Sequence, residues 1–323
     1  MATETPPQPS SDVAGGLQGG AALVEGGPVG GGTAVIEGRT QWQIFWNRFK
    51  RHRLGLAAGG VLGVLMAMAY IYPLVSPYAF DEKHIPDRRT GPGWPYILGT
   101  NELGEDLFTQ VMHGGRISIT VGLLTAVTAT LIGTALGAAA GYFGGWVDAL
   151  ISRVTDVFLA APALAVLIAL AAVFDELTLT LIILVIAALS WMPIARLVRA
   201  EFLGLKEREF VQAARAMGAS PLRIIWRHVL PNALSVVIVA ATLLVGLAII
   251  IEATLSYLGI GIDPLSNPSW GNLLEDARNN VQEEWWLVLF PGAAIVLTVL
   301  CVNFLGDALR DALDPYAHRG GRH

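Results

Sequence analysis

The side chains that carry chemistry in this sequence lie in polar segments between long apolar stretches. Glu102, Glu105 and Asp106 form an acidic cluster, but no His or Cys stands beside them at metal-ligand spacing. Such a cluster is more typical of a solvated loop than of a metal site, because metal sites recruit several ligands at fixed spacing. We therefore expect neither a metal site nor a catalytic centre in this chain.

A phosphate-binding loop is also missing. The loop requires the pattern G-x-x-x-x-G-K-[ST], and the three lysines, Lys50, Lys83 and Lys206, follow Phe, Glu and Leu. An intramembrane protease would need a Ser–His pair or two Asp residues within a span, and the apolar stretches contain neither. If ATP drives this protein, a partner must bind the nucleotide.

The apolar stretches identify a polytopic membrane protein. Hydrophobic residues make up 54% of the 323 residues and charged residues only 15%, whereas a soluble domain carries about 25% charge. About 18 residues suffice to cross a hydrocarbon core of about 30 Å as a helix. Six stretches meet this length: 54–74, 117–140, 157–174, 177–195, 233–251 and 285–305. The third and fourth are separated only by Asp175 and Glu176, which predicts a tight hairpin.

None of these stretches contains Asp, Glu, Lys, Arg or His. Proton- and ion-coupled transporters usually carry such residues at mid-membrane, where the coupling ion needs a partner. The pattern argues against a stand-alone proton-coupled transporter, although a sodium site built from carbonyl groups would escape this test. A stand-alone secondary transporter or channel therefore stays open as an alternative.

Basic residues predict the orientation, because cytoplasmic loops carry an excess of Lys and Arg. With the N-terminus inside, the cytoplasmic segments hold sixteen basic residues and the external segments five. We therefore expect both termini in the cytoplasm. The external five are Lys83, Arg88, Arg89, Arg116 and Arg278.

The polar segment 199–232 is strongly basic and predicts two short amphipathic helices. The first covers 207–217, with Phe210, Ala214 and Met217 on one stripe. Gly218 follows the last periodic residue, where helices often end on a left-handed residue. Ser220 and Pro221 then predict a side-chain cap and a first-turn proline.

The second helix of this segment places four apolar residues on one face: Leu222, Ile225, Trp226 and Val229. Arg223 and Arg227 lie on another face. The periodicity alone is equally compatible with an interfacial hairpin that has no partner and with a hairpin onto which a partner docks.

The same segment resembles the coupling loop of ATP-binding-cassette importer permeases, which sits in a cleft of the ATPase subunit in that family. The pattern has E-A-A, then G, then L-P about a dozen residues later, and Gln212 stands where Glu is usual. The run ARAMGASPLRIIWRHVLPN resembles the dipeptide/oligopeptide/nickel branch more narrowly. The resemblance implies ATPase coupling by Gln212, Ala213, Ala214, Gly218, Ser220, Pro221, Leu230 and Pro231.

A second motif, before the second apolar stretch, also resembles that branch. It comprises Leu98, Gly99, Thr100, Gly104, Asp106 and Arg116. Asn101 and Glu105 depart from the Asp and Arg that the pattern favours, which weakens the expectation of an ion pair there. The glycines and acidic residues predict a structured turn followed by a helix. Pro-Ser-Trp-Gly at 268–271 and the C-terminal apolar stretch also resemble the branch, so the resemblance covers about 42–315.

The remaining segments complete the domain organisation. Residues 1–40 are rich in Gly and Pro and predict a disordered cytoplasmic tail. Residues 41–53 predict an amphipathic interfacial helix with aromatic anchors and basic residues. We expect a six-span permease domain over 54–315, including the 199–232 loop, and a short cytoplasmic tail over 316–323.

The resemblance implies an all-α membrane protein with six transmembrane helices and the type I importer permease fold, in a bacterial or archaeal inner membrane. Its implied partners are a second homologous permease, two ATPase subunits or domains, an external substrate-binding protein and membrane lipid, but no nucleic acid. The segments 75–116 and 252–284 would contact the binding protein. ATP and Mg would be bound by the partner ATPases, so this chain is non-catalytic and has no cofactor. The implied substrate is a di- or oligopeptide, with nickel, glutathione, haem-related compounds or sugars as alternatives.

Overall fold

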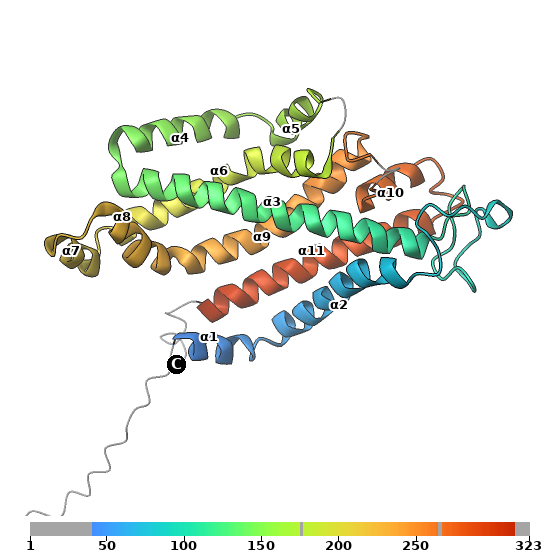
Figure 1. Ribbon diagram of the computed structural model, residues 1–323, viewed down its shortest axis with the longest axis horizontal. Helices are drawn as coiled ribbons and strands as arrows, with labels where there is room; N and C mark the ends of the chain where they lie inside the picture. Colours follow the sequence, from blue (N-terminus) through green and yellow to red (C-terminus); the bar gives the residue numbers. More distant parts are fainter. Residues whose placement is uncertain (1–40, 175–176, 264–266, 314–323) are drawn as a thin grey trace, which may run out of the picture. The chain divides into compact units, whose positions relative to one another are not determined.

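A computed structural model describes residues 41–174, 177–263 and 267–313 (Figure 1). The expected disordered tail over 1–40, the hairpin at Asp175 and Glu176, and the tail over 316–323 lie outside the described residues. The described chain is helical and contains no β-strand, only an isolated bridge between Thr100 and Asp106. The all-α prediction is therefore confirmed.

Among the helices, the longest connection is the segment between α2 and α3, and the next longest joins α9 to α10. In chain order they are α1 (Gln41–Phe49), α2 (Arg53–Val75), η1 (Ile85–Asp87), α3 (Leu107–Phe143), α4 (Gly145–Leu159), α5 (Ala163–Ala171), α6 (Leu179–Leu205), α7 (Glu209–Ala216), α8 (Pro221–Ile224), η2 (Ile225–Val229), α9 (Leu230–Tyr257), α10 (Trp270–Ala277) and α11 (Trp286–Leu313).

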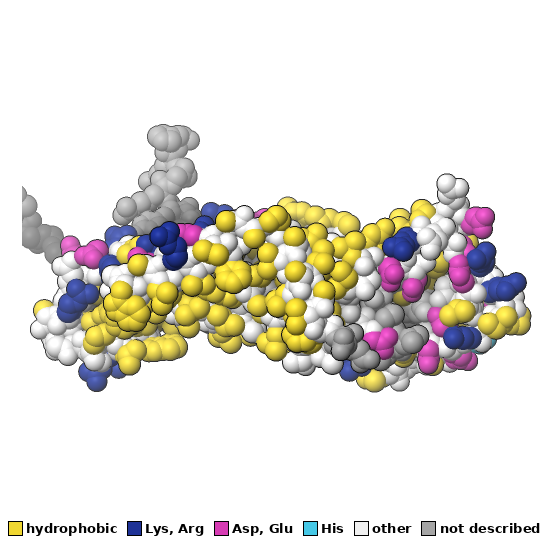
Figure 2. Space-filling model, turned by 90° about the horizontal axis from the view of Figure 1, so that it is seen from above, with side chains coloured by type: hydrophobic (Ala, Val, Ile, Leu, Met, Phe, Trp, Pro, Cys, Tyr) yellow, Lys and Arg dark blue, Asp and Glu magenta, His cyan; other side chains and the backbone are white. Residues whose placement is uncertain are grey.

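Five helices within the described residues are long and apolar enough to cross a membrane: α2, α3, α6, the continuous run Pro221–Tyr257 and α11. The pair α4 and α5 would make a sixth span, but it is bent by 88°. Figure 2 shows hydrophobic side chains along the middle of the visible face and charged side chains toward its two ends. This distribution fits helices that cross a bilayer.

The third predicted span, 157–174, is wrong as a single straight helix. Its first residues belong to the end of α4, and a new helix, α5, starts only at Ala163. Pro162 is the residue before that helix. Proline lacks a backbone N–H and its ring clashes with the preceding turn, so the α4 helix cannot run through it.

Helices α3 and α6 pack together through a stripe of glycines on α3. Cβ atoms added at Gly133 and Gly137 would lie 2.6 and 2.5 Å from the carbonyl oxygens of Trp191 and Ala195. A Cβ on Gly141 would lie 2.6 Å from that of Phe202. Spaced four residues apart, these glycines share one helix face and allow the close backbone approach typical of membrane helices.

Ion pairs attach α4 to α6. Arg196 pairs with Asp156, and Arg199 pairs with Asp148, whose second carboxylate oxygen lies 2.7 Å from the guanidinium. Helix α6 continues to Leu205, so Arg199 belongs to this helix and not to the polar loop predicted to begin there. The pairing explains why a helix with several charged residues can lie beside the bundle.

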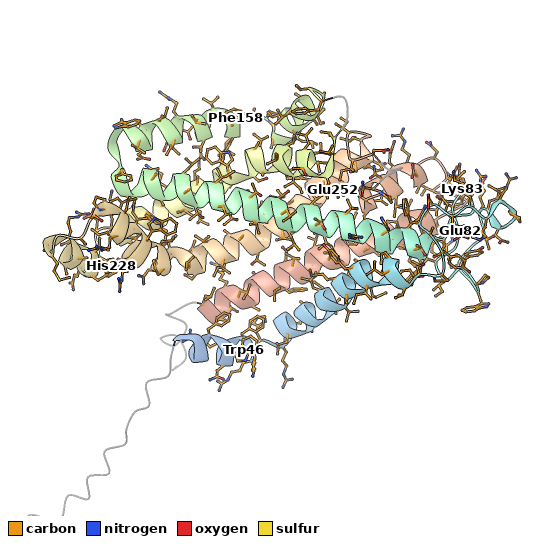
Figure 3. The ribbon with its side chains drawn as sticks, in the orientation of Figure 1. Trp46, Glu82, Lys83, Phe158, His228 and Glu252 are labelled. Atoms are coloured by element: carbon orange, nitrogen blue, oxygen red, sulfur yellow. The ribbon has the colours of Figure 1, made fainter. Side chains whose placement is uncertain are left out.

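Helix α1 forms within the segment predicted as an interfacial helix and contacts α11. Phe49 stacks against Phe45 and Trp46, with ring centroids 6.0 and 5.9 Å apart. The Lys50 ammonium lies 5.3 Å from the centre of the Trp46 ring. Figure 3 places Trp46 and His228 toward one end of the bundle, and Glu82 and Lys83 at the other.

Candidate functional site

The hairpin formed by residues 207–230 lies at one end of the bundle, where α7 and α8 are labelled in Figure 1. Helix α7 begins with Glu209 and has Arg215 in its last turn, an arrangement that complements the helix dipole. Gly218 follows with φ +79°. The N–H of Ala219 donates to Ala214 O, and that of Gly218 to Arg215 O. These two bonds define a Schellman ending, so the predicted left-handed glycine is confirmed.

The apolar stripe predicted for the first helix is partly wrong. Ala214 is buried, but Phe210 and Met217 are 41% and 81% exposed. Val211 takes the inward position and is fully buried. The reason is that α7 packs against α8 and η2, and Val211 and Ala214 join the buried cluster there, so the tertiary contact selects which of two overlapping stripes faces inward.

The second helix differs from its prediction in the same way. The four residues predicted on one face do not share one environment: Ile225 and Val229 are buried together with Ile224, whereas Leu222 and Trp226 are 63% and 68% exposed. Each helix of the hairpin therefore carries exposed large apolar residues at helical spacing, seven residues apart in α7 and four apart in the second helix. Exposed apolar side chains that gather into one patch mark a protein or membrane interaction site.

The start of the second helix also departs from expectation. Pro221 occupies the first turn as predicted, but the Ser220 side chain makes no capping hydrogen bond. The helix does not end before the next span. It passes through the π-helical turn η2 directly into α9, so Pro221–Tyr257 is one element of 37 residues.

The residues expected to couple to an ATPase lie together on this hairpin. Most are exposed, Ala214 is buried and Leu230 is half-buried. The Gln212 amide donates to Glu207 O at 3.0 Å and stays at the surface. The exposed members are Gln212, Ala213, Gly218, Ser220, Pro221 and Pro231.

The second predicted motif lies at the opposite end of the bundle and forms a packed turn. Gly99 and Gly104 have φ +87° and +77°. A Cβ on Gly104 would lie 2.0 Å from His84 O. Thr100 is fully buried, and its carbonyl accepts a hydrogen bond from Trp286 Nε1 at 3.2 Å. The turn and the following helix α3 confirm the predicted local structure.

The acidic cluster of this turn is not the solvated loop that the sequence predicts. Glu105 and Asp106 are 7% and 5% exposed. Asp106 caps α3 by accepting from the N–H of Thr109 at 2.9 Å. Glu105 accepts from the amides of Asn101 and Gln110, both at 2.6 Å. The two departures from the family pattern, Asn101 and Glu105, thus bond to each other.

Arg116 does not join the other residues of this motif. It lies ten residues into α3 and is exposed. At a rise of about 1.5 Å per residue, this places it about 15 Å along the helix from Asp106. The structure therefore brings together Leu98, Gly99, Thr100, Gly104 and Asp106 only.

A cavity of 490 Å³ opens between this turn and α10. Its charged lining residues are Asp81, Lys83, Glu102, Glu105 and Asp276. Among the described residues, no group of three or more His, Cys, Asp or Glu side chains is arranged to hold a metal ion. Because four of its five charged lining residues are acidic, we call the cavity the acidic recess; it opens at the end of the bundle that carries the turn.

Two groups near the recess titrate abnormally. Burial raises the pKa of the Glu284 carboxyl, against the opposing effect of Arg89, whose Nε lies 3.0 Å from it. Burial and the hydrogen bond that the Tyr96 hydroxyl donates to Asp87 raise the pKa of Tyr96 to about 12. Arg89 also contacts Glu102 at 3.1 Å, so it links the segment before α3 to the segment before α11.

Glu252 is a residue that sequence reasoning placed wrongly. The fifth span was predicted to end at 251, with Glu252 opening an external segment. Helix α9 instead continues to Tyr257, and the Glu252 side chain is completely buried. It accepts hydrogen bonds from Ser118 and Ser256 at 2.9 and 2.8 Å. A Ser four residues after a Glu is a possible local signal, but Ser118 lies 134 residues away.

Two family models match the chain. One, described as the inner membrane component of binding-protein-dependent transport systems, matches residues 133–319. The other, the N-terminal transmembrane domain of oligopeptide transport permease C, matches residues 40–92. The 207–230 hairpin lies inside the first match, and the turn around Gly99 falls between the two.

Curated relatives match most of the chain. A glutathione transport system permease protein of Pectobacterium atrosepticum is 39% identical, covering 86% of this chain and 92% of the relative. A dipeptide transport system permease protein of Alkalihalophilus pseudofirmus is 39% identical, covering 85% and 90%. An oligopeptide transport system permease protein of Mycobacterium bovis is 40% identical, covering 83% and 92%.

A solved structure shares the fold. It is an inward-facing form of the MetNI methionine ABC transporter, with a TM-score of 0.53 and 18% sequence identity. The match covers 64% of this chain and 98% of the other. The predicted type I importer permease fold is therefore confirmed.

Proposed function

The chain belongs to the family of inner membrane components of binding-protein-dependent transport systems, and we propose that it is the permease subunit of an ATP-driven peptide importer. The observation that carries the proposal is the 207–230 hairpin. It presents exposed apolar side chains on both of its helices and joins a membrane-crossing helix without a break.

Membership of this family places the chain in the inner membrane as a multi-pass protein and implies ATPase and binding-protein partners. We propose a complex of this chain with a second homologous permease, two ATPase subunits or domains and one external binding protein. The basic bias of the predicted cytoplasmic segments supports an orientation with both termini and the hairpin in the cytoplasm.

The hairpin is proposed as the docking surface for the ATPase. Phe210, Met217, Leu222 and Trp226 supply apolar area that a partner's cleft would bury, and Trp is among the residues enriched at interface hot spots. Gly218 sets the angle between α7 and α8. The buried residues Val211 and Ile224 anchor the hairpin on the bundle, so a displacement of the hairpin is passed to the helices beneath it.

ATP and Mg are proposed to bind only to the partner ATPases, and this chain performs no covalent chemistry. In this proposal, closure of the ATPases moves the hairpin, and the helix Pro221–Tyr257 carries the movement into the membrane. The pathway then opens to the outside and accepts substrate from the binding protein. Hydrolysis resets the inward-facing state.

A peptide is the proposed cargo because relatives of about 40% identity are named as dipeptide and oligopeptide permeases. Glutathione is the second candidate, since a permease named for it is equally similar. Both are peptides with a free amino group and a carboxylate, so the proposal concerns one chemical class.

Uptake by a reconstituted complex tests the proposal. The chain is purified with its co-purifying subunits in proteoliposomes, and uptake of labelled dipeptide, tetrapeptide and glutathione is measured with internal ATP. We expect uptake that requires both ATP and the binding protein. Uptake driven by an ion gradient without ATP would contradict the proposal and favour a secondary transporter.

The Gly218→Val variant tests the role of the hairpin. Forcing a β-branched residue into a left-handed conformation costs about 1–2 kcal/mol. We expect normal insertion, but weak assembly with the ATPases or ATP hydrolysis without uptake. Arg223→Ala is the control with a milder effect. Normal uptake by Gly218→Val would show that the hairpin is a simple linker.

A further inference from the structure

Glu252 stands out among the described residues because it belongs to a membrane-crossing helix and its carboxyl is completely buried inside the helix bundle. A carboxyl in such surroundings is costly unless its oxygens are hydrogen-bonded, and residues of this kind usually serve a function. Here Oε2 accepts from Ser118 of α3 and Oε1 from Ser256 of α9, and Ser269, the N-cap of α10, also hydrogen-bonds to the carboxyl. The group is therefore a built polar junction inside an apolar bundle.

The junction extends to α10 through Ser118. The Ser118 hydroxyl oxygen also accepts the backbone N–H of Trp270, the first residue of α10, at 3.2 Å. The Trp270 side chain is 3% exposed, and its Nε1 donates to Val111 O of α3 at 2.8 Å. Glu252, Ser118 and Trp270 thus connect three helices whose residues lie up to 152 positions apart.

Helix α10 packs closely on the same turn of α9. A Cβ on Gly271 would lie 2.6 Å from both Ala253 O and Ser256 Cβ. A capping box between Ser269 and Asn272 starts the helix rigidly. Leu273 and Asp276 of this helix line the acidic recess. The position of α10 on α9 therefore determines one wall of the recess.

The other end of α9 reaches the 207–230 hairpin. The continuous element Pro221–Tyr257 has 37 residues, which corresponds to about 55 Å. In Figure 3, His228 marks its hairpin end and Glu252 lies near α10. One rigid helix thus has the hairpin at one end and the polar junction at the other.

We infer that Glu252 is the positioning residue through which α9 holds α10 and so links the 207–230 hairpin to the recess at the opposite end of the bundle. When α9 moves, the Ser118–Glu252 and Ser118–Trp270 bonds, together with the hydrogen bond between Ser269 and Glu252, carry α10 with it. The same bonds work in reverse, because coupling between two sites is reciprocal. A partner that contacts α10 would therefore be sensed at the hairpin.

This inference rests on the proposed function only where ATPase activity is measured. How α10 is attached to α9 is measured independently of that function. Hydrogen–deuterium exchange of residues 269–277 in the purified complex reports the attachment of α10, and the peptide 145–159 of α4 serves as an internal reference. We expect Glu252→Ala to raise exchange in 269–277 and to leave 145–159 unchanged.

Glu252→Gln is the conservative variant. Its amide keeps an acceptor for one serine and donates to the oxygen of the other, so the junction survives without a carboxyl. We expect exchange of 269–277 close to the unsubstituted protein. Leu255→Ala is the matched control, because Leu255 is also fully buried in α9 but its side chain is apolar. It should lower thermal stability without a selective change in 269–277.

The activity readout is the ratio of ATPase activity with loaded binding protein to basal activity. We expect Glu252→Ala to retain basal hydrolysis and to lower this ratio by about fivefold or more, the lower range of measured coupling between sites. Glu252→Gln should restore the ratio, and Leu255→Ala should leave it unchanged. If Glu252→Ala does not assemble, Ser118→Ala removes the shared bond and should show the same two effects.

Three outcomes would overturn the inference. The first is unchanged exchange of 269–277 in Glu252→Ala or its substitute Ser118→Ala. The second is that Glu252→Gln changes exchange and the ATPase ratio as much as Glu252→Ala does. The third is that Leu255→Ala lowers the ATPase ratio as much as Glu252→Ala does. Absence of any uptake by the unsubstituted complex would instead refute the proposed function, while the exchange measurement would still decide the inference.

Discussion

The two ends of the helix bundle both carry motifs that contain a left-handed glycine, but the two motifs differ in how deeply their residues are buried. At the hairpin end, a Cβ on Gly218 would meet nothing within 4 Å, and the neighbouring motif residues are mostly exposed. At the other end, Gly104 is in contact with the backbone of His84, and Thr100 and Asp106 are buried. One motif offers a surface, whereas the other builds a packed turn.

The contrast shows that a motif by itself does not separate binding from packing. Trp226 and Trp270 both lie in segments that resemble the same family, yet Trp226 is 68% exposed and Trp270 is 3% exposed. Substitutions at matched positions of the two ends should therefore separate loss of a partner from loss of the fold.

The largest difference is expected between the two tryptophans. Trp270→Ala removes a buried side chain and its hydrogen bond to Val111 O, and should cost about 3–5 kcal/mol of stability. Trp226→Ala should change stability by less than about 0.5 kcal/mol, as surface substitutions usually do. Thermal unfolding in detergent measures both effects.

The same pair should reverse its order in an assembly assay. Trp226→Ala is expected to lower co-purification of the ATPase by about tenfold or more, because a central interface Trp contributes about 2 kcal/mol or more. Normal ATPase co-purification with Trp226→Ala would contradict the contrast between the two ends, since the exposed tryptophan would then not be a docking residue.

The second pair consists of glycines with similar positive φ. Gly218→Ala suffers only the left-handed strain of about 1–2 kcal/mol. Gly104→Ala adds a contact of 2.0 Å with His84 O, and overpacking costs about 1–3 kcal/mol more. We expect a clearly lower unfolding temperature for Gly104→Ala. Equal temperatures would mean that the turn around Gly104 relaxes without cost.

The third pair consists of residues at helix starts. Asp106→Ala removes the cap of α3 and should cost about 0.5–2 kcal/mol. Ser220→Ala should cost less than about 0.5 kcal/mol, because the Ser220 side chain makes no capping bond. Denaturant or thermal titration of the two variants provides the measurement. A large loss in Ser220→Ala would indicate that its hydroxyl caps α8 in solution.

The smallest effect is a pH dependence at the recess end. Burial holds the pKa of Glu284 above its ordinary value of 4.5, so protonation favours the folded state. Local stability should be greatest below that ordinary value and should fall as the pH rises through the raised pKa. Exchange of residues 280–290 at several pH values measures this, and Glu284→Gln should remove the dependence. The peptide 209–216 provides the reference from the other end.

Local signals predicted several features correctly. Five of the six apolar stretches identified membrane helices, because length and hydropathy suffice for that assignment. The left-handed Gly218 followed from the end of one periodic segment, since only local sterics decide it. The family motifs correctly indicated the type I importer permease fold.

Long-range packing decided the rest. Val211 and not Phe210 shares the buried face with Ala214, because two stripes overlap on a short helix and only contact with α8 and η2 selects between them. The bond between Asn101 and Glu105 turned two departures from a pattern into partners across a tight turn. Glu252 became a buried junction because its partner Ser118 is 134 residues away and because α9 continues past the apolar stretch. Composition and periodicity describe one helix at a time, whereas burial of a carboxyl depends on which other helices surround it.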